Sequence, residues 1–299
     1  MQPRVSAGVH FDILPMRLRH LLPALLLVPV LAHAEGPGDR LPATGGVTQI
    51  EGAAGGGLVP WALIAGYGTD RQVGLTAFVT SADPTDFELK AAGLAVGIFD
   101  RVELSYARQW LGLGTTVPGE SISQDVVGAK LRLAGDGVFD QDRAMPQIAF
   151  GVQYKHNVDM AIPTALGARN GSGLDVYLAA TKVWLGAVFG RNLLLNGTLR
   201  ATKANQFGLL GFGGDLSDRY RVVPEVSVGL FLTDRLVFGG EVRRKPNNLS
   251  AFREQTAGDI YVAWFPDKRV SITAGWVLLG QIADKQEQEA LYVSFQLNY

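Results

Sequence analysis

From residue 35 onward, the chain alternates apolar residues with polar or small residues in segments of about ten positions. The pattern is clearest in residues 291–299, and it recurs in residues 126–133, 148–156, 195–203 and 270–278. A period of two is that of a β-strand whose two faces meet different environments. No apolar run in this part approaches the roughly 18 to 20 residues that a membrane-spanning helix needs. The pattern therefore predicts an all-β fold.

Composition supports this prediction. The chain has 37 glycines with no collagen-like period, and glycine weakens a helix by about 1 kcal/mol per residue relative to alanine. It has no cysteine, which excludes a disulfide framework, a thiolate nucleophile and sulfur metal ligands.

The first 34 residues have the pattern of a secretory signal peptide. Basic residues follow Met16, residues 21–31 are apolar, and Ala32 and Ala34 form a small-x-small end. We expect cleavage after Ala34 and a true start at Met16. A membrane anchor fits less well, because the apolar stretch is short and contains two prolines. Residues 35–299 then form one domain.

The charge of the mature part excludes one class of partner. Without residues 1–34 the chain keeps 24 basic and 27 acidic residues, a formal net charge of -3. Nucleic-acid binding usually requires a basic patch or stripe. The sequence therefore predicts no nucleic-acid partner.

The turns distinguish a membrane barrel from a soluble sandwich. Short Asp-Arg or Asp-Lys corners at Asp70, Asp100, Asp234 and Asp267 suit tight turns. Short periplasmic turns at one end and long extracellular loops at the other are typical of transmembrane barrels. We therefore predict a closed, antiparallel, up-and-down transmembrane β-barrel. The longer polar or glycine-rich segments expected as loops are residues 52–57, 111–123, 157–173, 205–218, 246–258 and 280–289.

The number of strands follows from counting back from Tyr299. About thirteen segments are clear, beginning with residues 59–68, and an even number is needed if both ends are periplasmic. Residues 44–51 supply a further strand, so we predict about 14 strands, with 12 as the alternative. Aromatic residues near the strand ends, including Trp61 and Trp110, fit a belt at the membrane boundary.

Residues 193–214 and 43–52 resemble the bacterial family catalogued as domain of unknown function 3034. The resemblance extends over most of residues 40–299. It implies a proteobacterial envelope protein and brings no established activity or catalytic residues. Separately, the alternating C-terminal residues resemble the signal that the barrel-assembly machinery recognises in its clients. The residues of this signal are Leu291, Val293, Phe295, Leu297 and Tyr299.

Charged residues inside the strands fall on the phase opposite the apolar face. On a lipid-facing position at mid-membrane, Arg or Lys would cost about 2 to 4 kcal/mol, so this phase should face the lumen. The residues predicted to line a pore are Lys130, Arg132, Lys155, Arg200, Arg221, Glu225, Glu241 and Arg243. Such a lining suits passive passage of small polar or anionic solutes. The same side chains could instead pair across the lumen and close it, in a structural or surface-interaction barrel.

A third hypothesis is a membrane-embedded hydrolase centred on His156, the one histidine after residue 34. Asp159 and Ser172 follow it, but no G-x-S-x-G elbow is present. The carboxylates of Asp136, Asp140 and Asp142 lack the full spacing of a calcium loop. The sequence thus predicts no enzyme, no cofactor and no metal.

These patterns together predict a Gram-negative outer-membrane protein of porin-like type. Its expected partners are outer-membrane lipid and lipopolysaccharide, with periplasmic chaperones and the barrel-assembly machinery during biogenesis. The sequence does not indicate a solute or an oligomeric state.

Overall fold

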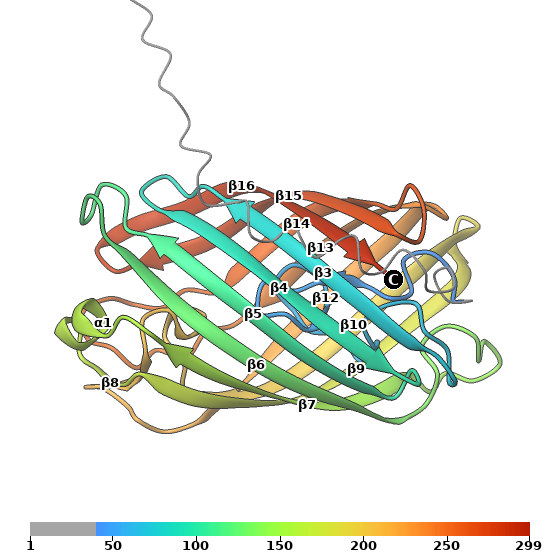
Figure 1. Ribbon diagram of the computed structural model, residues 1–299, viewed down its shortest axis with the longest axis horizontal. Coiled ribbons are helices and arrows are strands. Elements are labelled where there is room, and N and C mark those ends of the chain that lie inside the picture. Colours follow the sequence, from blue (N-terminus) through green and yellow to red (C-terminus); the bar gives the residue numbers. More distant parts are fainter. Residues whose placement is uncertain (1–39) are drawn as a thin grey trace, which may run out of the picture. The chain divides into compact units, whose positions relative to one another are not determined.

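The computed structural model describes residues 40–299, so the predicted signal peptide, with Met16, Ala32 and Ala34, lies outside the described residues. Twelve antiparallel strands form a closed barrel, and β16 pairs with β3 to complete the ring (Figure 1). No helix among these residues is long and apolar enough to cross a membrane. The barrel strands are β3 (Val73–Ala82), β4 (Glu88–Ile98), β5 (Val102–Gly112), β6 (Ser121–Ala134), β7 (Gln147–Asn157), β9 (Ser172–Val188), β10 (Arg191–Thr202), β12 (Arg221–Thr233), β13 (Leu236–Arg243), β14 (Ala257–Trp264), β15 (Val270–Ile282) and β16 (Lys285–Asn298).

The up-and-down order places the connections at two ends of the barrel. The end that holds the start of β3 and the end of β16 is called the terminus end, and the opposite end is called the loop end. Corners at Asp100, Asp234 and Asp267 lie at the terminus end, as predicted. Asp70 instead precedes β3, and the expected loop at residues 280–289 is a two-residue turn between β15 and β16. Connections at the terminus end are residues 99–101, 135–146, 189–190, 234–235 and 265–269; those at the loop end are 83–87, 113–120, 158–171, 203–220, 244–256 and 283–284.

Two of the loop-end connections carry small elements of their own. The connection between β7 and β9 contains α1 (Ala161–Ala165) and β8 (Ala168–Asn170). The connection between β10 and β12 contains the 3-10 helix η2 (Gln206–Gly208) and β11 (Phe212–Gly214). Because β8 and β11 pair with each other, the two connections are joined at the loop end.

The outer face of the barrel is apolar. Each of the twelve strands exposes at least one large apolar side chain, and on β16 the exposed fraction of Leu291 is 62%. Val293, Phe295 and Leu297 continue the alternation of β16 and are exposed on the same face. An apolar surface that surrounds a barrel is suited to lipid and unsuited to water. The fold is therefore that of a transmembrane β-barrel, and four of the five predicted assembly-signal residues lie on its outer face.

The lumen is filled by the chain itself. Residues 40–68, called the plug, lie inside the barrel, and all but three of them are buried (blue in Figure 1). The plug is a re-entrant hairpin in which β1 (Val47–Thr48) pairs with β2 (Ala54–Gly55). Its base lies at the terminus end, where Arg40 pairs with Asp100. Its tip is at Gly52, whose φ of +96° is readily available only to glycine.

The plug accounts for the strand count, which is twelve, at the lower end of the predicted range. Residues 44–51 and 59–68 were expected to be barrel strands, and this assignment is wrong. Both segments lie in the plug, as do the glycines 52–57 that were expected to form an outer loop. Pro60 lacks an N–H group for a sheet ladder, and β16 closes the ring on β3 without these segments. Trp61 belongs to the plug too, so it is not part of an aromatic belt.

Candidate functional site in the plugged lumen

The base of the plug is held through its backbone by an ion pair on the barrel wall. Glu103 accepts hydrogen bonds from the N–H groups of Ala54 (3.1 Å) and Ala65 (2.9 Å). Lys130 donates to the carbonyls of Ala54 (3.0 Å) and Leu63 (2.8 Å) and pairs with Glu103 at 3.0 Å. This ion pair is called the Glu103 clamp. Because the plug has little regular secondary structure, the clamp supplies hydrogen bonds to plug backbone groups that would otherwise lack partners.

Glu241 on β13 holds the next part of the plug in the same way. One carboxylate oxygen accepts the N–H groups of Leu58 (2.6 Å) and Val59 (3.3 Å), and the other accepts the hydroxyl of Ser227 at 2.6 Å. A Cβ atom on Gly56 would collide with this carboxylate. Glycine at position 56 therefore lets the plug backbone approach the wall.

Uncharged wall side chains complete the backbone bonding of the plug. The carbonyl of Pro60 accepts the Thr198 hydroxyl at 2.8 Å, and the carbonyl of Ile50 accepts the Gln109 amide at 2.8 Å. Ala62 donates its N–H to the Thr181 hydroxyl at 2.7 Å. A polar lumen face is thus what a plug with few internal hydrogen bonds requires.

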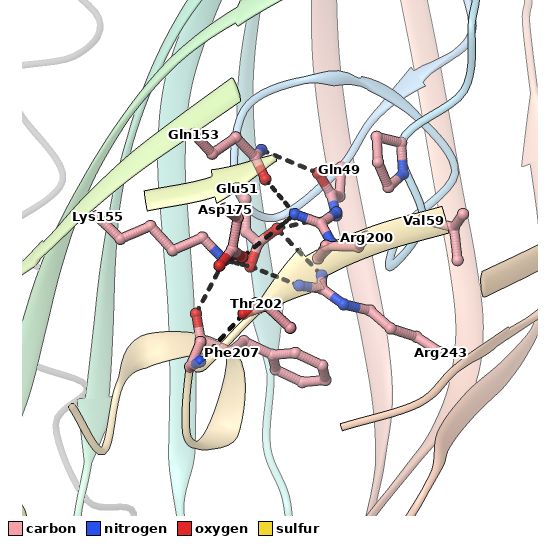
Figure 2. Close-up of polar contacts among 12 residues, drawn as sticks. Gln49, Glu51, Val59, Gln153, Lys155, Asp175, Arg200, Thr202, Phe207 and Arg243 are labelled. Carbon is pink, nitrogen blue, oxygen red and sulfur yellow. Dashed lines mark hydrogen bonds and ion pairs between the residues drawn. The ribbon is translucent and has the colours of Figure 1, made fainter. Parts of the chain in front are cut away.

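The tip of the plug is held through a side chain instead. Glu51, next to Gly52, is fully buried and contacts three cations of the wall (Figure 2). Arg243 forms two hydrogen bonds of 3.0 Å with its carboxylate, Lys155 donates a third, and Arg200 lies 3.7 Å away. Burial alone would raise the pKa of Glu51, but attraction to Arg243, Lys155 and Arg200 outweighs it and holds the pKa well below its usual range.

Two wall carboxylates share the same cations. Asp175 on β9 lies 2.8 Å from Lys155 and 3.3 Å from Arg200, while Glu225 on β12 lies 2.6 Å from Arg200 and 3.3 Å from Arg243. With Glu51 in place, three cations face three carboxylates. These six residues, called the Glu51 cluster, are Glu51, Lys155, Asp175, Arg200, Glu225 and Arg243.

A chain segment from the loop end closes over this cluster. The carbonyl of Phe207 accepts a hydrogen bond from Lys155 at 3.1 Å, and the ring of Phe207 lies 4.5 Å from the guanidinium carbon of Arg243 (Figure 2). Behind it, Lys245 pairs with Glu254 at 3.0 Å. The Glu51 cluster is therefore enclosed by the plug on one side and by the β10–β12 connection on the other.

Of the eight side chains predicted to line a pore, six are buried on the inner face of the barrel. They bond to the plug or to one another rather than to an open passage: Lys130, Lys155, Arg200, Glu225, Glu241 and Arg243. Arg132 lies at the terminus end, bonded to Asp100 and to the carbonyl of Gly135. Arg221 is exposed at the loop end. That these residues line a conducting pore remains a prediction.

The sequence predicted Glu225, which pairs with Arg200 and Arg243, but not the other carboxylates that pair with these cations, Glu51, Glu103 and Asp175. Glu103 and Asp175 lie on the inward phase of β5 and β9, so the period-two pattern could have identified them. Glu51 offered no such signal, because the plug has no regular phase. The sequence therefore showed the cations of the wall but not their partner on the plug.

The residues of the hydrolase hypothesis do not form a triad. His156 faces outward, and its Nδ1 lies 2.8 Å from the hydroxyl of Ser172. Asp159 bonds instead to the N–H and hydroxyl of Ser123. Within residues 40–299, no group of three or more His, Cys, Asp or Glu side chains is arranged to hold a metal ion.

A closed barrel with an apolar outer face and a polar, plugged lumen defines a β-barrel protein of the outer-membrane type. The chain belongs to the family described as "Protein of unknown function (DUF3034)", which matches residues 44–296. The predicted family resemblance is thereby confirmed. No curated protein matches the chain in sequence.

Solved structures of similar fold include two porins and a channel. The KdgM porin is 10% identical with a TM-score of 0.47, covering 75% of this chain and 99% of its own. The NanC porin is 10% identical with a TM-score of 0.49, covering 75% and 98%. An outer membrane channel from Pseudomonas putida F1 is 10% identical with a TM-score of 0.43, covering 81% and 97%. Similarities this distant do not indicate what this chain binds or transports.

Proposed function

We propose that this protein is an outer-membrane channel whose lumen is closed at rest by the plug. Displacement of the plug opens a path for small polar solutes. The observation that carries the proposal is the polar part of the inner wall, which bonds the plug with charged and hydrogen-bonding side chains, beside an apolar part where Trp61 packs near Leu194 and Phe231. Water can solvate such groups once the plug has left, whereas an apolar core would resist wetting.

The size of the barrel supports the same conclusion. Barrels of about eight strands have an interior that side chains fill, and those of about 16 strands leave an aqueous channel. Twelve strands here enclose a 29-residue segment. Removal of that segment would leave a water-filled lumen lined by the six buried charged residues.

A closed structural barrel is the competing function, since Glu51 is fully buried and ion-paired. Conductance in planar bilayers separates the two. We expect the wild-type chain to be mostly closed and Glu51→Lys to show stable channel steps, because a fourth cation among Lys155, Arg200 and Arg243 repels the tip. Glu287→Lys, at an exposed site on β16, is the matched control and should behave as wild type.

Folding of each variant can be verified by its heat-dependent mobility on gels before conductance is measured. If folded Glu51→Lys stays as silent as the control, the lumen is permanently closed and the structural barrel is the correct function. A transport role without catalysis also predicts that His156→Ala leaves conductance unchanged.

We further propose that the chain reaches the outer membrane by Sec export and cleavage after Ala34. The apolar outer face and the alternating residues Leu291, Val293 and Phe295 support an outer-membrane location and recognition by the assembly machinery. Lipid and lipopolysaccharide are the expected surroundings. Mass spectrometry of the mature N-terminus tests the cleavage site, and an N-terminus other than Glu35 would contradict it.

A further inference from the structure

A small basic pocket adjoins the Glu51 cluster on the side of the loop end. It is a shallow hollow open to solvent, and it is bordered by four cationic residues: Arg200, Arg243, Arg244 and Lys245. Within residues 40–299, Lys245 pairs with Glu254, whereas no ion pair joins the side chain of Arg244, which is exposed. Arg200, Arg243 and Lys245 are already paired with carboxylates, so Arg244 supplies the uncompensated positive charge that attracts an anion to this hollow.

The balance of charge in the Glu51 cluster depends on the plug. The wall supplies three cations, Lys155, Arg200 and Arg243, but only two carboxylates, Asp175 and Glu225. The third carboxylate, that of Glu51, comes from the tip of the plug. The wall by itself therefore has the composition of a carboxylate-binding site, and the plug fills it.

The geometry of Arg243 indicates the kind of ligand. Its guanidinium holds both oxygens of Glu51 at 3.0 Å, the two-point contact that a planar carboxylate forms with arginine. Arg243 and Arg200 belong to the Glu51 cluster and also border the basic pocket. A second carboxylate in this pocket would compete with Glu51 for the same cations.

We propose, on the basis of the plugged-channel function above, that the basic pocket binds the carboxylate of a small anionic solute. The bound carboxylate replaces Glu51 on Arg243 and Arg200, and the tip of the plug leaves its site. The solute thereby opens its own path. No covalent bond changes in this process; the solute acts by binding the open state more tightly than the closed state.

The absence of cysteine from the chain allows a direct test. Ala53, beside the tip, is only 2% exposed, so a thiol introduced by Ala53→Cys should react slowly with a membrane-impermeant maleimide. In the full-length barrel reconstituted in vesicles, we expect succinate to raise the labelling rate about tenfold, a size common for coupling between sites. Succinamide, its uncharged analogue, should not raise the rate, and sodium chloride of the same ionic strength should raise it far less than succinate does.

Two arginines of the same connection provide a matched pair. Arg244→Gln, at the pocket, removes one of its four cations. In this variant, the succinate concentration needed to raise the labelling rate of Ala53→Cys should increase about tenfold. Arg253→Gln, exposed and outside the pocket, should not. Equal labelling with succinate and succinamide, or equal effects of the two substitutions, would overturn the proposal.

Calorimetry provides a second measurement that does not need the cysteine. Glu51→Gln removes the competing carboxylate, so succinate should bind this variant about tenfold more tightly than the wild type. Weaker or unchanged binding contradicts competition at the cluster. If Glu51→Lys conducts but succinate neither speeds the labelling of Ala53→Cys nor binds Glu51→Gln more tightly, the channel function stands and the ligand inference fails. If Glu51→Lys never conducts, the channel function itself fails.

Discussion

The base and the tip of the plug are attached to the same barrel wall by different means. At the base, the Glu103 clamp bonds the backbone N–H and carbonyl groups of Ala54, Leu63 and Ala65. At the tip, the wall holds one side chain, that of Glu51, through ion pairs. Backbone bonds at the base are spread over several residues, whereas all the ion pairs that hold the tip run through a single carboxylate, with Gln109 adding a hydrogen bond to the carbonyl of Ile50. We therefore expect the tip to open while the base remains attached.

The largest effect is expected at the base. Glu103→Ala leaves Lys130 as a buried charge without its carboxylate and leaves two plug N–H groups unbonded. Loss of one partner of a buried ion pair costs about 3 to 5 kcal/mol. The free energy of unfolding in detergent micelles, from guanidinium titration followed by tryptophan fluorescence, measures this loss. Glu120→Ala, at an exposed site, is the control, and equal midpoints for both variants would show that the base is not held by Glu103.

Glu51→Gln is expected to have a smaller effect on unfolding and a larger effect on opening. The cations that lose Glu51 keep Asp175 and Glu225, so we expect a loss of about 1 to 3 kcal/mol. Maleimide labelling of Ala53→Cys should nevertheless become much faster in this variant. A loss of stability as large as that of Glu103→Ala, without faster labelling, would mean that tip and base form one unit.

Salt should affect the two regions differently. Opening of the tip separates Glu51 from three wall cations and exposes these charges to screening by salt, whereas at the base Glu103 and Lys130 both belong to the wall and stay paired when the plug leaves. In about 1 M potassium chloride we therefore expect faster labelling at the tip, through Ala53→Cys, and little change at the base, through Ala65→Cys. Ala65 is 4% exposed, so both positions begin protected. An equal change in labelling rate at the two positions would show that the tip and the base are not held by different means.

The smallest effect is expected from acid. The folded pKa of Glu51 lies below its ordinary value of 4.5, so its ion pairs add stability above that value and lose it only as the pH falls through the lowered folded pKa. The labelling rate of Ala53→Cys, divided by that of free cysteine at the same pH to remove the loss of thiolate, should thus be nearly the same at about pH 7 and pH 5. Opening in this interval would show that Glu51 gains a proton far more easily than its three cations imply.

A contrast between the regular barrel wall and the irregular plug explains what could be predicted from the sequence. The cations Lys130, Arg200 and Arg243 lie on the inward phase of regular strands, so alternation alone placed them in the lumen. The plug could not be placed in this way, because residues 44–51 and 59–68 have the apolar content of strands. Only the closed ring and the wall side chains that bond their backbone show that they lie inside.

Two local features of the sequence could have indicated that residues 44–51 and 59–68 are not barrel strands. The glycines at 52–57 give a segment able to turn tightly, and Pro60 interrupts the strand that was expected at residues 59–68. Glu51, between them, carries no periodic signal at all. Its role depends on three cations from strands that are more than a hundred residues away, and such contacts are set by tertiary structure.

Hydrogen–deuterium exchange of the full-length barrel tests the central claim most directly, since it reports the opening of each backbone segment. In the wild type, amides throughout residues 44–66 should be protected as strongly as those of the barrel strands. In Glu51→Gln, protection should fall around Gly52 and persist at Ala54 and Ala65, whose N–H groups bond to Glu103. Wild-type plug amides that exchange as fast as the exposed loop-end connections would contradict a plugged lumen.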